Sequence, residues 1–219
     1  MATPDDTSET PAPRRSIAMP TATLAIIAAV LTVGLVVIAN VTRDRIARNQ
    51  QAWIKQHLDT LVPPDSYDND PLTDTLQVGS PDLLGSASPV TAYRMRKAGA
   101  PVAVAIRSVA PDGYRGPLEL LVVIAPKGTL IGARVIRHNE TPGLGDAFEN
   151  RDKDWLTRFR GLSLTNPQQQ RWTVRRDGGD FDAFTGATIT PRAIVKAVRR
   201  TLEFYRGNEE LLYKEAQHR

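Results

Sequence analysis

The chain has 219 residues, and its 28 Lys and Arg against 24 Asp and Glu give a net charge of +4. So small an excess does not predict nucleic-acid binding, which normally requires a basic stripe on one face. The length suits one domain of ordinary size with an appendage. The absence of cysteine excludes thiol nucleophiles, disulfides and cysteine-held clusters, and only three histidines are present. We therefore expect no metal site and no histidine-based triad, and whatever chemistry occurs would use a bound organic cofactor or none at all.

An uncharged run from residue 16 to residue 42 has arginines on both sides. About 20 apolar residues are enough to cross a bilayer, so the run predicts a transmembrane helix. One alternative is a cleaved signal peptide, whose apolar core is usually about 7–15 residues, with a weak cleavage site at Val37-Ile38-Ala39. Another is a buried core helix. The arginines after the run favour a cytoplasmic C-terminal side, but long domains translocate largely regardless of such charges, so the sequence leaves the orientation open.

The segments around this run differ in composition. Residues 1–15 predict a disordered tail. Residues 43–89 read as a stalk helix and an acidic loop. The helix continues to about Leu61, with Ile46, Trp53, Ile54 and Leu58 at near-helical spacing, and Pro63-Pro64 ends it. Aspartates accumulate over 59–82. We expect Trp53 to pack on the soluble domain. We interpret the acidic stretch as a solvated, irregular loop, with a partner-binding loop as the alternative.

Short segments rich in β-branched residues follow, at 90–96, 102–109, 118–125 and 130–138. The third is almost wholly apolar, which predicts a central strand buried on both faces. A short helix at 154–159, a further strand at 172–176 and an amphipathic helix at 191–206 complete the pattern. This order predicts an α+β domain over 90–206, with a C-terminal tail at 207–219.

The segment from His138 to Asp146 contains a proline and two glycines within four residues. Glycine permits positive φ angles and close approach of a ligand, so a tight turn is expected here. Leu144 stands between Gly143 and Gly145 at its tip. Such a leucine could lie against the flat ring of a ligand, or it could tuck into the core of the domain.

The segment from Asp182 to Thr190 leads into the last helix. Thr190 followed by Pro191 predicts an N-cap and a first helical residue. Free N–H groups at a helix N-terminus favour a phosphate, and the small residues Gly186 and Ala187 would let one approach. Thr185, Thr188 and Thr190 would supply hydroxyl groups. The alternative is a capped helix with a loop of small residues.

These segments resemble a known family. Thr185-Gly-Ala-Thr188, with Asp182 before it and Thr190 after it, resembles the S/T-G-A-T motif of covalent flavoproteins, which carry FMN through a phosphodiester bond to the last threonine. The segment from Glu140 to Gly145 resembles the flavin-contacting loop of the same domain. With residues 113–121, 154–163 and the N-terminal anchor, the chain is most similar to the G subunit of the Rnf (Rsx) ion-translocating electron transport complex. A cousin is the C subunit of the sodium-pumping NADH:quinone reductase.

The resemblance, which covers about residues 90–206, implies roles for particular residues. FMN would be attached to Thr188 by a separate flavin transferase, which takes the FMN moiety from FAD and releases AMP. The attachment loop would comprise Asp182, Thr185, Gly186 and Ala187. Thr141, Gly143 and Leu144 would contact the isoalloxazine ring, and Glu140 would shape the loop.

The resemblance also implies a function. The chain would be an electron carrier without substrate turnover of its own, in a complex that links NADH or ferredoxin redox chemistry to ion movement. Its partners would be the other subunits, and its flavin domain would face the periplasm from the bacterial inner membrane. Two alternatives remain: a flavin-binding sensory or regulatory membrane protein, and an anchored interaction domain in which the Thr188 loop only caps a helix.

Overall fold

The computed structural model describes residues 18–149 and 155–214, without the side chains of residues 18–20, 44–48 and 50. The tail predicted for residues 1–15, the side chain of Ile46 and the first residue of the helix predicted at 154–159 lie outside this description. The chain divides between Gln50 and Gln51 into two compact units.

Helix α1 runs without a break over Ala18–Leu61, 44 residues in all. Its portion Thr21–Arg43 is long and apolar enough to cross a membrane, and none of it is buried against the rest of the described chain. The alternative of a buried core helix is therefore wrong. One apolar helix of this kind is compatible with a single-pass membrane anchor.

A five-stranded antiparallel sheet forms the centre of the second unit, in the order β1-β2-β3-β4-β5. The strands are β1 (Thr75–Val78), β2 (Val90–Lys97), β3 (Ala100–Ala110), β4 (Leu118–Ala125) and β5 (Thr129–Arg137). Each strand pairs with its neighbour along the chain, so the sheet is a simple meander. The four predicted strands are confirmed to within a few residues, whereas β1 was not predicted.

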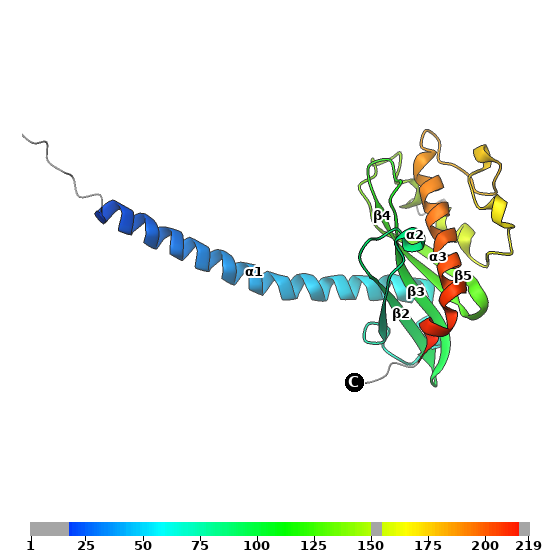
Figure 1. The fold of residues 1–219 in the computed structure, drawn as a ribbon, viewed down its shortest axis with the longest axis horizontal. Coiled ribbons are helices and arrows are strands. Elements are labelled where there is room, and N and C mark those ends of the chain that lie inside the picture. The colour runs from blue at the N-terminus through cyan, green and yellow to red at the C-terminus, as the bar shows by residue number, and fades with distance from the viewer. Residues whose placement is uncertain (1–17, 150–154, 215–219) are drawn as a thin grey trace, which may run out of the picture. The chain divides into compact units, whose positions relative to one another are not determined.

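The sheet is buried on both faces by two helices from distant parts of the chain. Helix α3 (Ile189–Tyr213) packs against β3 and β4, where Ile194 and Val198 are fully buried, and Figure 1 shows it lying along the sheet. The end of α1 belongs to the core on the opposite face, where Leu58 is fully buried beside Met95 and Leu121. The sheet with α3 is the predicted α+β domain, and β4 is buried on both faces as predicted.

The acidic stretch is more ordered than the irregular loop that we predicted. It contains β1, the short helix α2 (Pro81–Leu84) and the 3-10 turn η1 (Pro64–Ser66). Asp74 pairs with Arg94 at 2.5 Å and with Arg96 at 3.0 Å. Because Arg94 is only 3% exposed, its buried guanidinium requires a counter-charge, and the acidic segment supplies it. At least one of the aspartates is therefore structural.

Two helix predictions also need correction. Trp53 does not pack into the domain, since it is 40% exposed and rests edge-on against His57 of the same helix. Helix α3 extends beyond the predicted end at Arg206, through a kink at Asn208, to Tyr213. The extension persists because Leu212 is fully buried and because Arg94 and Arg96 donate hydrogen bonds to the carbonyls at the end of the helix.

No strand forms at 172–176. The segment lies between two 3-10 turns, η6 (Gln169–Arg171) and η7 (Arg175–Asp177), and only Val174 makes an isolated bridge, to Phe181. Trp172 instead packs against Phe159 and Phe181 in an aromatic cluster. The described residues also contain the 3-10 turns η2 (Pro126–Gly128), η3 (Ala147–Glu149) and η5 (Trp155–Phe159), the last on the segment predicted as a short helix.

The packing of α1 predicts that its end is part of the soluble domain. Leu58→Ala would leave a cavity under the sheet and should lower the free energy of unfolding by about 2–5 kcal/mol. The matched change Leu211→Ala, at a position 48% exposed, should cost about 1 kcal/mol or less. Denaturant unfolding of the full chain in detergent, followed by fluorescence of the buried Trp155 and Trp172, measures both. Equal losses would show that α1 does not contribute to the core.

Candidate functional site

The loop after β5 is a tight turn built on its own backbone. The carbonyl of Thr141 accepts hydrogen bonds from the N–H groups of Leu144 and Gly145, both at 3.1 Å. Gly143 has a φ angle of +76°, which other residues rarely adopt. The turn leaves Leu144 41% exposed. The alternative in which this leucine tucks into the core is therefore wrong.

The loop before α3 is a second tight turn, and Asp182 anchors it to neighbouring segments. The N–H of Ala187 donates to the carbonyl of Phe184 at 3.0 Å, and Gly186 has a φ angle of +79°. The carboxylate of Asp182 pairs with Arg158 and Arg175, and its carbonyl accepts a hydrogen bond from the Trp155 indole at 2.9 Å. Asp182 thus fixes the position at which this loop leaves the aromatic cluster.

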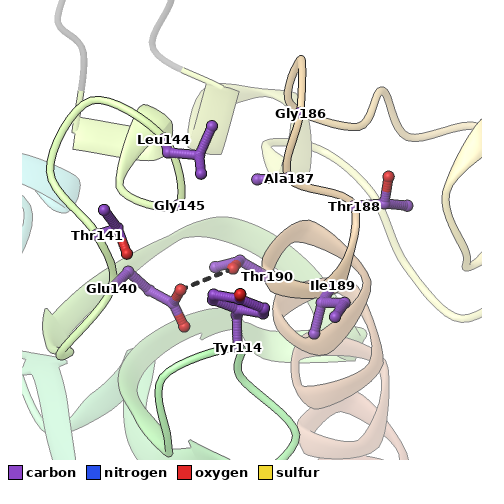
Figure 2. A pocket seen from close by; sticks show the side chains of 10 residues that line it. All are labelled: Tyr114, Glu140, Thr141, Leu144, Gly145, Gly186, Ala187, Thr188, Ile189 and Thr190. Atoms are coloured by element: carbon purple, nitrogen blue, oxygen red, sulfur yellow. Dashed lines mark hydrogen bonds between the residues drawn. The ribbon is translucent and has the colours of Figure 1, made fainter.

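Thr188, not Thr190, occupies the N-cap position of α3. Its side chain makes no capping hydrogen bond and is half-buried. In Figure 2 it extends away from Glu140 and Thr190. Thr190 is instead fully buried within the first turn of the helix, so the predicted N-cap at Thr190 is wrong. The hydroxyl of Thr188 therefore makes no capping bond, whereas that of Thr190 is enclosed and bonded to Glu140.

A hydrogen bond between Glu140 and Thr190 joins the two loops. The Thr190 hydroxyl donates to Oε2 of Glu140 at 3.0 Å, and the Arg115 N–H donates to Oε1 at 3.3 Å. The carboxylate is only 5% exposed. Figure 2 shows this bond at the base of the hollow between the loops.

Two glycines make room for this carboxylate. A Cβ atom on Gly145 would lie 2.6 Å from Oε2 of Glu140, and one on Gly113 would lie 3.0 Å from Oε1 and 2.2 Å from the carbonyl oxygen of Gly116. Both distances to Glu140 are shorter than an ordinary van der Waals contact. At Gly145 the closest contacts of an added Cβ are all with Glu140, whereas at Gly113 a Cβ would meet the Gly116 carbonyl oxygen and the Leu118 side chain first.

The two loops, the start of α3 and the β3–β4 turn enclose a cavity of about 140 Å³. Ten residues line it: Tyr114, Glu140, Thr141, Leu144, Gly145, Gly186, Ala187, Thr188, Ile189 and Thr190. Leu144, Tyr114 and Ile189 are all exposed large hydrophobic side chains. The cavity therefore combines an apolar rim with one buried carboxylate.

The cavity brings together six of the nine site residues predicted from the sequence, and Gly143, Thr185 and Asp182 lie in the same loops but outside its lining. Tyr114, Gly145, Ile189 and Thr190 also line it and were not among those nine residues. Tyr114 carried a usable signal, because it is an aromatic residue in a short turn between Gly113 and Gly116, much as Leu144 stands between two glycines.

The cations at the start of α3 are neutralised by partners outside the cavity. Arg192 donates two hydrogen bonds to Asp177, at 2.6 and 3.0 Å, and this contact lowers the pKa of the Asp177 carboxyl. Lys196 pairs with Asp112. Positive potential at this end of the helix therefore comes chiefly from the N–H groups of its first turn.

The packing around Glu140 predicts the effect of a single methyl group. Gly145→Ala should lower the free energy of unfolding by about 1–3 kcal/mol, because the added Cβ overlaps the buried carboxylate. A Cβ on Gly79 would meet no atom within 4 Å, so Gly79→Ala should change stability by no more than about 0.5 kcal/mol. Denaturant unfolding of both variants measures the difference. An undisturbed Gly145→Ala variant would contradict the close packing.

Comparison with known proteins shows the family. Residues 113–203 match the FMN-binding domain family. The chain is 40% identical over 199 residues to the G subunit of the ion-translocating oxidoreductase complex of Shewanella loihica, across 91% of this chain and 94% of that protein. The corresponding G subunits of Pseudoalteromonas atlantica and Photorhabdus laumondii are 45% and 47% identical, over 84% and 82% of this chain and 86% and 85% of their own lengths. The chain therefore belongs to the family of G subunits of ion-translocating oxidoreductase complexes and contains an FMN-binding domain.

Proposed function

We propose that this chain is the FMN-carrying electron-relay subunit of an ion-translocating oxidoreductase complex, with the FMN joined by a phosphodiester bond to Thr188. The observation that carries the proposal is the contrast among the threonines of the attachment loop. Thr188 is half-buried at the edge of the cavity without a capping hydrogen bond, Thr190 is fully buried and bonded to Glu140, and Thr185 lies outside the cavity lining. Among these three threonines, Thr188 alone combines a hydroxyl that makes no capping bond with a place in the cavity lining.

The position of Thr188 suits a phosphate. It is the residue directly before the first turn of α3, where the N–H groups have no partners within the helix and where the helix dipole favours negative charge. Pro191, the third residue of the helix, has no N–H, so the N–H groups of Ile189 and Thr190 remain as donors. A phosphodiester at Thr188 would carry one negative charge into this region.

The size of the cavity supports a covalent attachment. At about 140 Å³ it is smaller than the pockets of about 300–1,000 Å³ that usually enclose a small ligand. The isoalloxazine ring would rest against the apolar rim formed by Leu144, Tyr114 and Ile189, and much of the cofactor would lie outside. So shallow a site would hold free FMN weakly at low concentration, and a covalent bond removes that dependence on concentration.

The side chains of the site hold and orient the cofactor. When bound, FMN supplies electron transfer in steps of one or two electrons. Gly186 and Ala187 allow its close approach, and Asp182 holds the loop through Arg158 and Arg175. The attachment itself requires a partner, a flavin transferase that transfers FMN from FAD to the Thr188 hydroxyl and releases AMP. In the assembled complex the chain would exchange electrons with the other subunits.

The attachment site can be tested by co-expression with a flavin transferase. In-gel flavin fluorescence after denaturing electrophoresis should appear for the natural chain and disappear for Thr188→Ala. Thr185→Ala should retain at least part of the signal, and Thr190→Ser, which keeps the hydroxyl that bonds Glu140, should retain it in full. Fluorescence that survives Thr188→Ala would place the bond elsewhere.

We also propose that the FMN-binding domain faces the periplasm from the bacterial inner membrane. The apolar helix would be a single-pass anchor, with residues 1–15 in the cytoplasm. A long segment that follows a single span can translocate despite arginines at its start, because flanking charge governs mainly short loops. Residues 43–89 would then form the stalk and the first part of the soluble domain.

The absence of cysteine makes the orientation easy to measure. Ala87 is exposed in the soluble domain, so Ala87→Cys would introduce a single accessible thiol. In spheroplasts a membrane-impermeant maleimide should label Ala87→Cys before lysis but Ser8→Cys only after lysis. The reverse pattern would place the domain in the cytoplasm.

A further inference from the structure

The carboxylate of Glu140 is buried in the wall of the cavity without a cationic partner. Its hydrogen bonds come from the neutral Thr190 hydroxyl and from the Arg115 N–H. Within the described part of the chain, no Lys, Arg or His side chain pairs with it. Burying an unpaired charge is unfavourable, and a neutral glutamine could occupy a similar volume. The space that the side chain fills therefore does not explain why a charged residue stands at position 140.

The charged and titratable groups around Glu140 leave it uncompensated. The Nδ1 atom of His138 accepts the N–H of Glu140, while its Nε2 atom faces Glu149 at 2.8 Å. Arg192 and Lys196 of α3 are paired with other carboxylates. The remaining titratable neighbours in the enclosing segments are Tyr114 and Arg115 in the β3–β4 turn and Asp146 in the loop after β5. In the described chain none of these groups forms an ion pair with Glu140, so its carboxylate lines the cavity without a paired cation.

We propose that Glu140 sets the reduction potential of the bound flavin and couples its reduction to a proton. This inference rests on the proposed function, because it requires FMN in this cavity. Glu140 would be a positioning and charge-setting residue in the cavity wall, beside the ring. The negative charge of a buried carboxylate opposes the arrival of an electron nearby more strongly than a fully solvated charge does. Protonation of Glu140 removes that opposition.

In the proposed step the uptake of one electron is coupled to the uptake of one proton. One electron arrives on the flavin from the electron donor of the oxidoreductase complex. One proton from water binds a carboxylate oxygen of Glu140, forming an O–H bond, so that the net charge of the site is unchanged. On reoxidation the electron leaves to the acceptor subunit, and the proton returns to water. The Thr190 hydroxyl donates to Oε2, and such a hydrogen bond favours a carboxylate over a carboxylic acid.

The test is a redox titration of the full flavinylated chain in detergent, followed by flavin absorbance over a series of pH values. For Glu140→Gln, reduction at high pH should be at least tenfold more favourable than in the natural chain, about 59 mV for a one-electron step. The difference should shrink as the pH falls, because the natural carboxylate becomes protonated and then resembles the glutamine. The matched control Glu149→Gln removes a carboxylate that is 58% exposed, and it should leave the potential unchanged.

A second pair of variants tests the proposal without changing Glu140. Thr190→Val removes the donor to Oε2 and should move the pH-dependent rise in potential to higher pH, whereas Thr190→Ser should restore the natural profile. If Glu140→Gln and the natural chain both hold flavin and have the same reduction potential at every pH, the role of Glu140 is overturned and the proposed function stays intact. If Glu140→Gln does not hold flavin, the two Thr190 variants decide. The role of Glu140 is then overturned if the reduction potentials of Thr190→Val and Thr190→Ser depend on pH in the same way. A natural chain without flavin would refute the proposed function itself.

Discussion

The hydrogen bond from Thr190 to Glu140 joins two loops that are 50 residues apart in the sequence, and the geometry of the site depends on it. It brings the turn after β5 against the first turn of α3 and so creates the cavity between them. The position of the carboxylate also explains why Gly145 lacks a side chain, since a Cβ there would overlap it. The helix begins at Ile189, with Thr188 at its N-cap.

The three threonines of the attachment loop look alike in the sequence but occupy different environments. Thr190 is consumed by the contact with Glu140, and Thr185 lies outside the cavity lining in a turn whose next residue must be glycine. Thr188 has the cavity on one side and no capping bond of its own. A shallow cavity beside this hydroxyl at a helix N-terminus suits the proposed tethered cofactor better than an enclosed one. In this proposal the buried carboxylate of Glu140 controls the charge around the cofactor.

Much of the fold followed from local patterns in the sequence. The alternation and β-branched residues of the four main strands predicted them well, and the two glycine-containing turns pointed to both sides of the cavity.

The errors arose where distant contacts override local signals. Strand β1 forms because β2 offers a partner and Arg94 needs a counter-charge, and neither fact is visible in an aspartate-rich segment. Helix α3 passes Gly207 because Leu212 is buried in the core, and Trp172 joins an aromatic cluster rather than a sheet. The prediction of an N-cap at Thr190 is wrong because the contact of this residue with Glu140 depends on the tertiary fold.

The central claim is that one FMN is bound covalently to Thr188, and mass spectrometry of the attachment peptide tests it most directly. Trypsin should release residues 177–192, which contain Thr185, Thr188 and Thr190 together. For the full chain isolated from cells with an active flavin transferase, we predict that this peptide gains the mass of one FMN less one water. Fragmentation should place the addition on Thr188. An unmodified peptide, or an addition on Thr185 or Thr190, would contradict the account.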